Sequence, residues 1–206
     1  MTSDSYPVRL KVNYPDRSLN RLTSAFRIFV AIPIVVVLAA VSGGSIGVRQ
    51  GEGAAAMAGG LLFAAPLLMI LFRRKYPRWW FDWNLELLRF TTRVIAYILL
   101  LRDEYPSTDE KQDVELDVDY PNVPTDLNRW LPLVKWLLAI PHLVILFFLG
   151  IAALFVTIFA WFAILFTGRY PAGAFGFVVG VMRWNTRVVG YAFLLVTDSY
   201  PPFSLD

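Results

Sequence analysis

The stretch VRLKVNYP at residues 8–15 decides the fold, because it returns as VELDVDYP at residues 114–121. Later motifs recur in the same order: LNR (19–21) as LNR (127–129), AIP (31–33) as AIP (139–141), and RFTTRVIAY (89–97) as RWNTRVVGY (183–191). A recurrence in fixed order indicates a tandem duplication. We therefore predict repeat 1 over 1–106, a charged linker over 107–112 and repeat 2 over 113–206.

Both copies of this stretch alternate apolar and polar residues, which predicts two short strands. The polar face of the first copy is basic, with Arg9 and Lys11, and that of the second is acidic, with Glu115, Asp117 and Asp119. Opposite charges favour cross-strand pairing. We expect the strands to form a small cytoplasmic β-sheet that packs on helices, with residues 98–101 and 193–196 as further strands.

The composition is that of an integral membrane protein. The 206 residues are 57% hydrophobic and 17% charged, with a mean hydropathy of +0.54, whereas soluble domains are about a quarter charged. The chain has no cysteine, which excludes disulfides, a cysteine nucleophile and thiolate metal ligands. The first residues also lack the basic start and apolar run of a signal peptide.

Three apolar stretches supply the expected membrane helices. Residues 22–41 and 54–72 each approach the ~20 residues that a spanning helix needs, and a glycine-rich loop separates them. Residues 131–166 are apolar apart from Lys135 and His142, and they are too long for one crossing. We therefore predict two helices with a turn near Gly150, so that each repeat carries a transmembrane helical hairpin.

Basic residues set the predicted orientation. Arg49, offset by Glu52, lies in the outer loop of the first hairpin, and the other Lys and Arg residues lie at the hairpin entries or beyond them. The positive-inside rule then places both termini in the cytoplasm. The prediction is a multi-pass protein of the cell (inner) membrane, with parallel repeats related by a two-fold axis along the membrane normal.

A third helix is expected in each repeat, over 79–101 and 174–196. The first carries one polar stripe at helical spacing: Asp82, Glu86, Arg89, Arg93 and Tyr97. The matching positions of the second are Gly176, Gly180, Arg183, Arg187 and Tyr191. The favoured hypothesis is an amphipathic helix in the membrane interface, because central arginines are costly in a crossing helix. A third crossing with buried arginines is the alternative.

The third helices also hold the candidate site residues. Guanidinium groups suit phosphate oxygens, so a lipid-headgroup site is one interpretation of the following residues: Arg89, Arg93, Arg183, Asn185 and Arg187. In the structural interpretation, which we favour, Asp82 and Glu86 of one repeat neutralise Arg183 and Arg187 of the other. Gly173, Gly176 and Gly180 form a small-residue face that favours close helix packing.

The sequence offers little for catalysis. His142 is the only histidine. A proton-handling role for it is one hypothesis, and a neutral histidine bonded to a carbonyl is the other. Phosphate-binding and zinc-protease motifs do not occur in the sequence, and no nucleophile with an adjacent base can be assembled from it. We expect no enzyme, cofactor or metal, and the net charge of +3 is explained by the membrane rather than by nucleic acid.

Four segments carry a family resemblance: NRWLPLVKWLLAIPH (128–142), LFTGRYP (165–171), RWN (183–185) and TDSYPP (197–202). They resemble a bacterial membrane family catalogued as domain of unknown function 4389. The first repeat departs from this pattern, with Ile34 in place of His142, Phe90 in place of Trp184 and Thr91 in place of Asn185. The resemblance supports the membrane fold and implies no activity or catalytic residues.

Together these features predict a mainly α membrane protein built from a tandem parallel repeat. We expect a non-enzymatic accessory or scaffold subunit that packs in a larger membrane complex or self-associates, with membrane lipids as its surroundings. The alternative is a lipid-binding or small transport protein that uses the cleft between the repeats.

Overall fold

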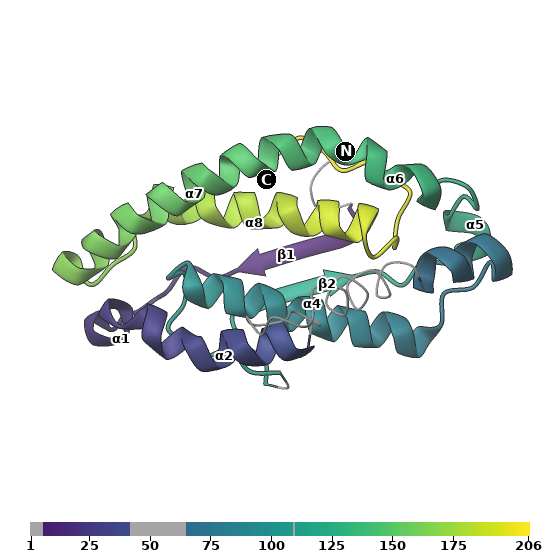
Figure 1. The fold of residues 1–206 in the computed structure, drawn as a ribbon. Coiled ribbons are helices and arrows are strands. Elements are labelled where there is room, and N and C mark those ends of the chain that lie inside the picture. Colours follow the sequence, from purple (N-terminus) through teal and green to yellow (C-terminus); the bar gives the residue numbers. More distant parts are fainter. Residues whose placement is uncertain (1–5, 42–64, 109) are drawn as a thin grey trace, which may run out of the picture.

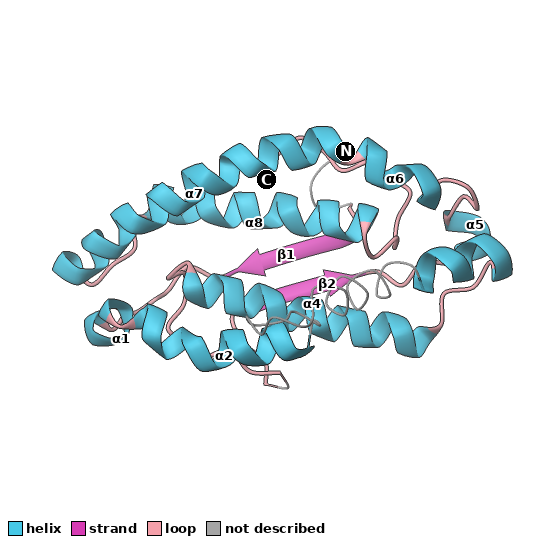
Figure 2. Ribbon diagram, viewed as in Figure 1, coloured by secondary structure: helices cyan, strands magenta, loops and turns pink. Residues whose placement is uncertain are grey.

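A computed structural model describes residues 6–41, 65–108 and 110–206. In this part of the chain the fold is mainly helical, with one two-stranded antiparallel sheet (Figure 2). The elements in chain order are β1 (Val8–Val12), α1 (Arg21–Ala25), α2 (Arg27–Val41), the π-helix η2 (Met69–Arg73), α4 (Arg78–Ile98), β2 (Val114–Val118), α5 (Val123–Asp126), α6 (Pro132–Leu138), α7 (Ile140–Thr167) and α8 (Ala172–Ala192).

The two strands pair with each other, as their alternation predicts. In the antiparallel register Leu10 lies opposite Leu116, its counterpart in the sequence repeat, and Val8 lies opposite Val118. The apolar side chains of both strands are buried. On the outer face Arg9 forms an ion pair with Asp119 at 2.6 Å. Basic and acidic strands therefore meet as expected, and the pairing is symmetric with respect to the repeated sequence.

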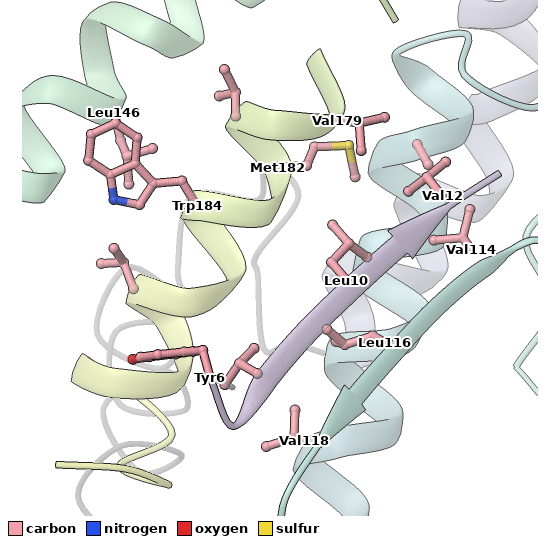
Figure 3. Close-up of a cluster of buried hydrophobic side chains, with 14 of the residues drawn as sticks. Tyr6, Leu10, Val12, Val114, Leu116, Val118, Leu146, Val179, Met182 and Trp184 are labelled. Atoms are coloured by element: carbon pink, nitrogen blue, oxygen red, sulfur yellow. The ribbon is translucent and has the colours of Figure 1, made fainter. Parts of the chain in front are cut away.

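Each strand packs on a helix from the other half of the chain. β1 contacts α8, and β2 contacts α4. Figure 3 shows Leu10 and Val12 of β1 directed toward Val179 and Met182 of α8, in one buried cluster with Leu116. The expectation that the sheet packs on the third helices is confirmed, and the two halves are interlocked through exchanged strands.

The hairpin of the second half differs from the prediction. The expected turn near Gly150 is wrong, because α7 continues through this residue. A glycine in a helix costs only about 1 kcal/mol relative to alanine, and no proline accompanies it. The chain turns instead after Thr167, where Gly168 has φ +75° and Pro171 caps α8. The antiparallel arms are thus α7 and α8 (Figure 1).

The corresponding hairpin of the first half is described only in part. The expected span over 22–41 is divided between α1 and α2, which are interrupted at Phe26. The predicted glycine-rich loop and the start of the next span, up to residue 64, lie outside the described residues. The remaining residues of that span are helical and end in η2, after which Tyr76-Pro77 leads into α4.

The start of each half contacts the hairpin tip of the other half. Leu19 donates its main-chain N–H to the oxygen of Gly168 at 2.8 Å, and the Tyr14 hydroxyl donates to the Tyr170 oxygen. In the reciprocal contact the Tyr120 hydroxyl donates to the Tyr76 oxygen. These pairs match under the sequence repeat, and they show that the two hairpins run in opposite directions.

Both third helices form, but the strands expected after them do not. α4 and α8 end at Ile98 and Ala192. Leu100 has φ +63° and Leu195 has φ +58°, a left-handed conformation that is incompatible with an extended strand. Both leucines are buried, so a backbone turn that packs the leucine inward replaces the predicted strand.

α7 is the one helix of the described residues that is long and apolar enough to cross a membrane. α2 is apolar but shorter. The two helices lie along opposite outer edges of the molecule, with the sheet between them (Figure 1). The multi-pass arrangement expected from the sequence is therefore reduced to one candidate span in the part of the chain that the structure describes.

The contact between β1 and α8 can be tested at Gly190. A Cβ added to Gly190 would lie 2.6 Å from Cγ2 of Val8. We expect Gly190→Ala to lower the free energy of unfolding by about 1–3 kcal/mol through overpacking, measured by unfolding in detergent. Combination with Val8→Ala, which removes the clash, gives a loss smaller than the sum of the two.

Gly176→Ala is the matched control, because no atom lies within 4 Å of its added Cβ. This change leaves stability unchanged or raises it by up to about 1 kcal/mol. Equal effects of Gly190→Ala and Gly176→Ala would contradict the packing of β1 on α8.

Candidate functional site

A buried lysine lies where the second hairpin begins. Lys135 of α6 is fully buried, and its Nζ lies 2.7 Å from Oδ1 of Asp198, which follows α8. Nζ also donates to the main-chain oxygen of Thr197 at 2.6 Å and lies 5.1 Å from the ring centroid of Tyr191. The carboxylate and the ring compensate the buried ammonium, and the contact joins the two ends of the hairpin.

The first half has a matching site. Arg27 and Asp103, which align with Lys135 and Asp198, form an ion pair in which Arg27 is buried. The guanidinium carbon lies 4.0 Å from the ring centroid of Tyr97, the counterpart of Tyr191. Arg27 also donates to the main-chain oxygen of Arg102 at 3.2 Å. Each half thus has a cation, a carboxylate and a tyrosine ring in the same relation.

Burial lowers the pKa of Lys135, because desolvation disfavours its charged form, and Asp198 opposes this effect. A lone buried ammonium is very costly in free energy, whereas a paired one with a carbonyl partner is tolerated. The arrangement closes the hairpin, and its chemistry is that of a structural ion pair.

The arginine stripe faces the sheet. Arg89 of α4 donates from Nε to the main-chain oxygen of Leu116 at 2.8 Å, and Arg183 of α8 donates from Nε to that of Leu10 at 3.2 Å. The two bonds match under the sequence repeat. Arg89 also pairs with Asp117 at 3.4 Å. These arginines therefore attach each strand to the helix beneath it.

The next arginines bind the segments that follow their helices. Arg93 donates to the main-chain oxygen of Ser107 at 2.7 Å, and Arg187 donates to the main-chain oxygen of Asp206. Arg187 is buried, and burial together with neighbouring Arg183 lowers its pKa, while Tyr6 and Asp206 oppose this. Both guanidinium groups thus have main-chain partners within the protein.

The expected ion pairs across the repeats are not the ones that form. Asp82 pairs with Arg78 at 3.2 Å and Glu86 pairs with Arg89 at 2.7 Å, both within α4. The cause is helix geometry, since Asp82 and Glu86 lie on the exposed side of α4, whereas Arg183 is directed to β1. The carboxylates that pair across the halves are instead those of Asp113, Asp117 and Asp119, with Arg102, Arg89 and Arg9.

The remaining candidates are separated from this cluster. Asn185 is exposed on α8. Gly173 and Gly176 are exposed as well, and no atom lies within 4 Å of a Cβ added to either. A Cβ at Gly180 would lie 2.8 Å from Leu205. The predicted helix-packing face is therefore occupied only at Gly180, and there by the segment after α8 rather than by a helix.

His142 is held among aromatic side chains. Its Nδ1 accepts a hydrogen bond from Trp184 Nε1 at 3.0 Å, and its ring stacks on Phe203 with centroids 4.0 Å apart. Accepting at Nδ1 assigns the proton of a neutral ring to Nε2. The counterparts in the first half, Ile34 and Phe90, belong to one apolar cluster. Both partners of the His142–Trp184 contact are thus replaced by apolar residues in the first half, which fits a packing role.

A hollow of about 450 Å³ lies over the outer face of the sheet. Its lining contains four cations, Arg9, Lys11, Arg183 and Arg187, and also acidic side chains: Glu115, Asp117 and Asp206. The mixture of signs neutralises much of its field. Within the described residues, no group of three or more His, Asp or Glu side chains is arranged to hold a metal ion.

The comparison with known families matches the second half of the chain. The model of the family described as Domain of unknown function (DUF4389) matches residues 130–204. The resemblance noted in the sequence is thereby confirmed over α6, α7 and α8 and the segment that follows them. No curated protein and no solved structure matches the chain.

The buried ion pairs are the site that sequence reasoning missed. In the sequence, Lys135 is visible only as an interruption of the apolar residues 131–166. The available signal was the repeat itself, because Arg27 and Lys135 are both basic and Asp103 and Asp198 both acidic at aligned positions. Charges kept at matching positions of apolar segments indicate partners in space.

The ion pair of the second half gives a direct test. Asp198→Asn leaves the Lys135 ammonium buried without its counter-charge, and we expect a loss of about 3–5 kcal/mol in the free energy of unfolding. Lys135→Met added to Asp198→Asn restores most of this loss. Unfolding of the purified protein in detergent measures both.

Asp82→Asn is the control, since it removes an exposed pair worth less than about 1 kcal/mol. A loss from Asp198→Asn as small as that from Asp82→Asn, or a double variant no better than Asp198→Asn alone, would disprove the role of the buried pair.

Proposed function

We propose that this chain is a membrane-embedded, non-enzymatic accessory or scaffold subunit, which packs in a larger membrane complex or associates with itself. The observation that carries the proposal is the outer surface of α7. Only 22% of its most apolar 18-residue window is buried inside the protein. Phe155 and Phe166 of α7 are 66% and 78% exposed.

An exposed apolar helix of this length requires lipid or protein around it. A core helix of a soluble protein is covered by its own chain, whereas α7 contacts mainly α8 on one side. On the opposite edge, Ile28 and Phe29 of α2 are also strongly exposed.

The sheet supports one orientation in the membrane. Arg9 and Asp119 remain 40% and 57% exposed, and charged groups in hydrocarbon are costly. The outer face of the sheet therefore belongs at the water side. An antiparallel pair with Leu10 opposite Leu116 has its local two-fold axis normal to the sheet. We propose that this axis follows the membrane normal, so that the duplicated units share one orientation. α7 runs along the strands (Figure 1), so in this orientation it lies within the apolar layer rather than upright across it.

We propose that both ends of the described chain lie on the cytoplasmic side. The Tyr6 hydroxyl donates to the main-chain oxygen of Ser199 at 3.0 Å, so the segments that begin and end the described chain are neighbours. With the basic residues assigned to the cytoplasm, both lie on the cytoplasmic side. α4 and α8, which contact the sheet, then lie near the interface.

The polar side chains described above bond to other groups of the protein, which favours a scaffold over a transport protein. Arg89 and Arg183 bind the strands, Arg27 and Lys135 close the hairpins, and His142 packs among aromatic rings. The alternative, a lipid-binding or transport role in the cleft between the halves, rests on the hollow over the sheet. That hollow faces the charged side of the sheet and has cations matched by carboxylates.

Purification in mild detergent from native membranes tests the proposal. We expect the tagged protein to be retained in the membrane fraction after alkaline carbonate washing, because in this proposal α7 is held by lipid. We expect a membrane protein or a second copy to be retained in stoichiometric amount, identified by mass spectrometry.

A matched sample carries Phe155→Asp and Phe159→Asp, which charge the exposed face of α7. We expect reduced membrane retention and loss of the partner. Release of the unaltered protein by carbonate, or a monomer without any stoichiometric protein, would contradict the proposal.

A further inference from the structure

A second hollow, distinct from the one over the sheet, lies where the apolar helix of the first half ends. Its volume is about 640 Å³, within the range of small-molecule sites. Arg73, Arg74 and Lys75 line one side, and Asn122 lies on the other. We call this site the basic hollow. None of the described residues that line it is acidic.

The three cations of the basic hollow are available to a ligand. All three side chains are exposed. The ion pairs found among the described residues do not include Arg73, Arg74 or Lys75. This distinguishes them from Arg27, Arg89, Arg183 and Lys135, whose contacts are made within the protein. Three neighbouring cations without an opposing carboxylate attract an anion.

The walls of the basic hollow are fixed by the fold. Two Tyr-Pro corners form them, at 76–77 and 120–121. The Tyr120 hydroxyl donates to the main-chain oxygen of Tyr76, and the guanidinium of Arg78 lies 4.6 Å from the Tyr120 ring centroid. Arg129 donates from Nε to the oxygen of Leu71 at 2.5 Å. These contacts therefore fix the turn that carries the three cations.

The repeat provides an internal comparison. A matching hollow of about 350 Å³ lies at the tip of the second hairpin, lined by Tyr14, Asp16, Arg17, Arg169 and Tyr170 among others. In the aligned repeats, Thr167-Gly168-Arg169 corresponds to Arg73-Arg74-Lys75, and Asp16 corresponds to Asn122. The second site thus has fewer cations and one carboxylate. Helix termination does not need the basic triplet, since α7 ends without a basic last turn.

Arg74 also has an unfavourable backbone. Its φ is +47°, in the left-handed region, where the matching Gly168 has φ +75°. A non-glycine residue in this conformation costs roughly 1 kcal/mol, and a glycine at Arg74 would relieve it. An arginine at a position that favours glycine is a local cost in stability. Such costs are concentrated at functional positions.

We propose that the basic hollow binds the phosphate of an anionic phospholipid headgroup. Guanidinium groups bind phosphate oxygens through paired hydrogen bonds, and the Asn122 amide supplies a neutral donor. Leu68 and Phe72, on the same helix, are exposed apolar side chains that would contact the acyl chains. The lipid as the source of the phosphate rests on the membrane placement proposed above.

The test measures binding of dioctanoyl phosphatidylglycerol to the full chain, purified in a neutral detergent, by native mass spectrometry. Dioctanoyl phosphatidylcholine and inorganic phosphate are the comparison probes. Arg73→Gln, Arg74→Gln and Lys75→Gln together remove the cations. We expect phosphatidylglycerol to bind at least about tenfold more weakly to this triple variant.

Two further variants keep the test independent of folding. Arg17→Gln with Arg169→Gln alters the matching hollow, and we expect its affinity to stay within about twofold of the unaltered protein. Arg74→Gly removes one cation and relieves the backbone. We expect it to unfold at a higher temperature while binding phosphatidylglycerol about fivefold more weakly.

Unchanged phosphatidylglycerol binding in the triple variant and in Arg74→Gly would overturn the site. Equal binding of phosphatidylcholine and phosphatidylglycerol would overturn anion recognition. Inorganic phosphate binding as tightly as phosphatidylglycerol would make the ligand a soluble phosphate and overturn the lipid. Release by carbonate with phosphatidylglycerol binding intact would refute the membrane placement alone.

Discussion

The antiparallel pairing of β1 with β2 is the constraint on which the rest of the structure depends. Five residues from each half meet with Leu10 opposite Leu116. Each strand then covers the third helix of the other half, and Arg89 and Arg183 each donate to a main-chain oxygen of the strand above them. A two-stranded sheet alone is marginal, so its stability comes from these helices. The halves cannot separate without exposing the apolar faces of both strands.

Closing each hairpin is the second requirement. A long apolar helix and a returning helix leave polar chain ends near one another, and a buried cation joins them in each half. Arg27 with Asp103 and Lys135 with Asp198 have different cations but the same partners: a carboxylate, a main-chain oxygen and a tyrosine ring. Removing one partner of a buried ion pair costs more free energy than the pair itself contributes to stability. The pair therefore holds the two ends of the hairpin together.

The sequence was sufficient for the features that local patterns encode. Alternation and opposite charge predicted the strands, their pairing and their packing on α4 and α8. The turn predicted near Gly150 is wrong, because a single glycine does not end a helix in an apolar run. The strands predicted after α4 and α8 are also wrong, since nothing local shows that Leu100 and Leu195 adopt a left-handed backbone.

For the candidate site, the sequence identified the arginines but not their partners. Asp82 and Glu86 share one polar stripe with Arg89, so spacing alone does not show that they pair within α4. The main-chain oxygens that Arg89 and Arg183 bind have no sequence signature. Lys135 and Asp198 are far apart in the chain, so only their counterparts in the repeat indicated a contact. The basic hollow is formed by two turns that the exchanged strands bring together.

The pairing direction can be measured directly, because the chain has no cysteine. Val8 lies opposite Val118 in the antiparallel register, whereas parallel pairing of the same stretches would place it opposite Val114. Cα atoms of facing residues in non-hydrogen-bonded pairs are about 4.5 Å apart, within the range of a disulfide. We predict that Val8→Cys with Val118→Cys forms an intramolecular disulfide on mild oxidation in membranes, and that Val8→Cys with Val114→Cys does not. The reverse result would contradict the antiparallel pairing on which the arrangement of the two halves depends.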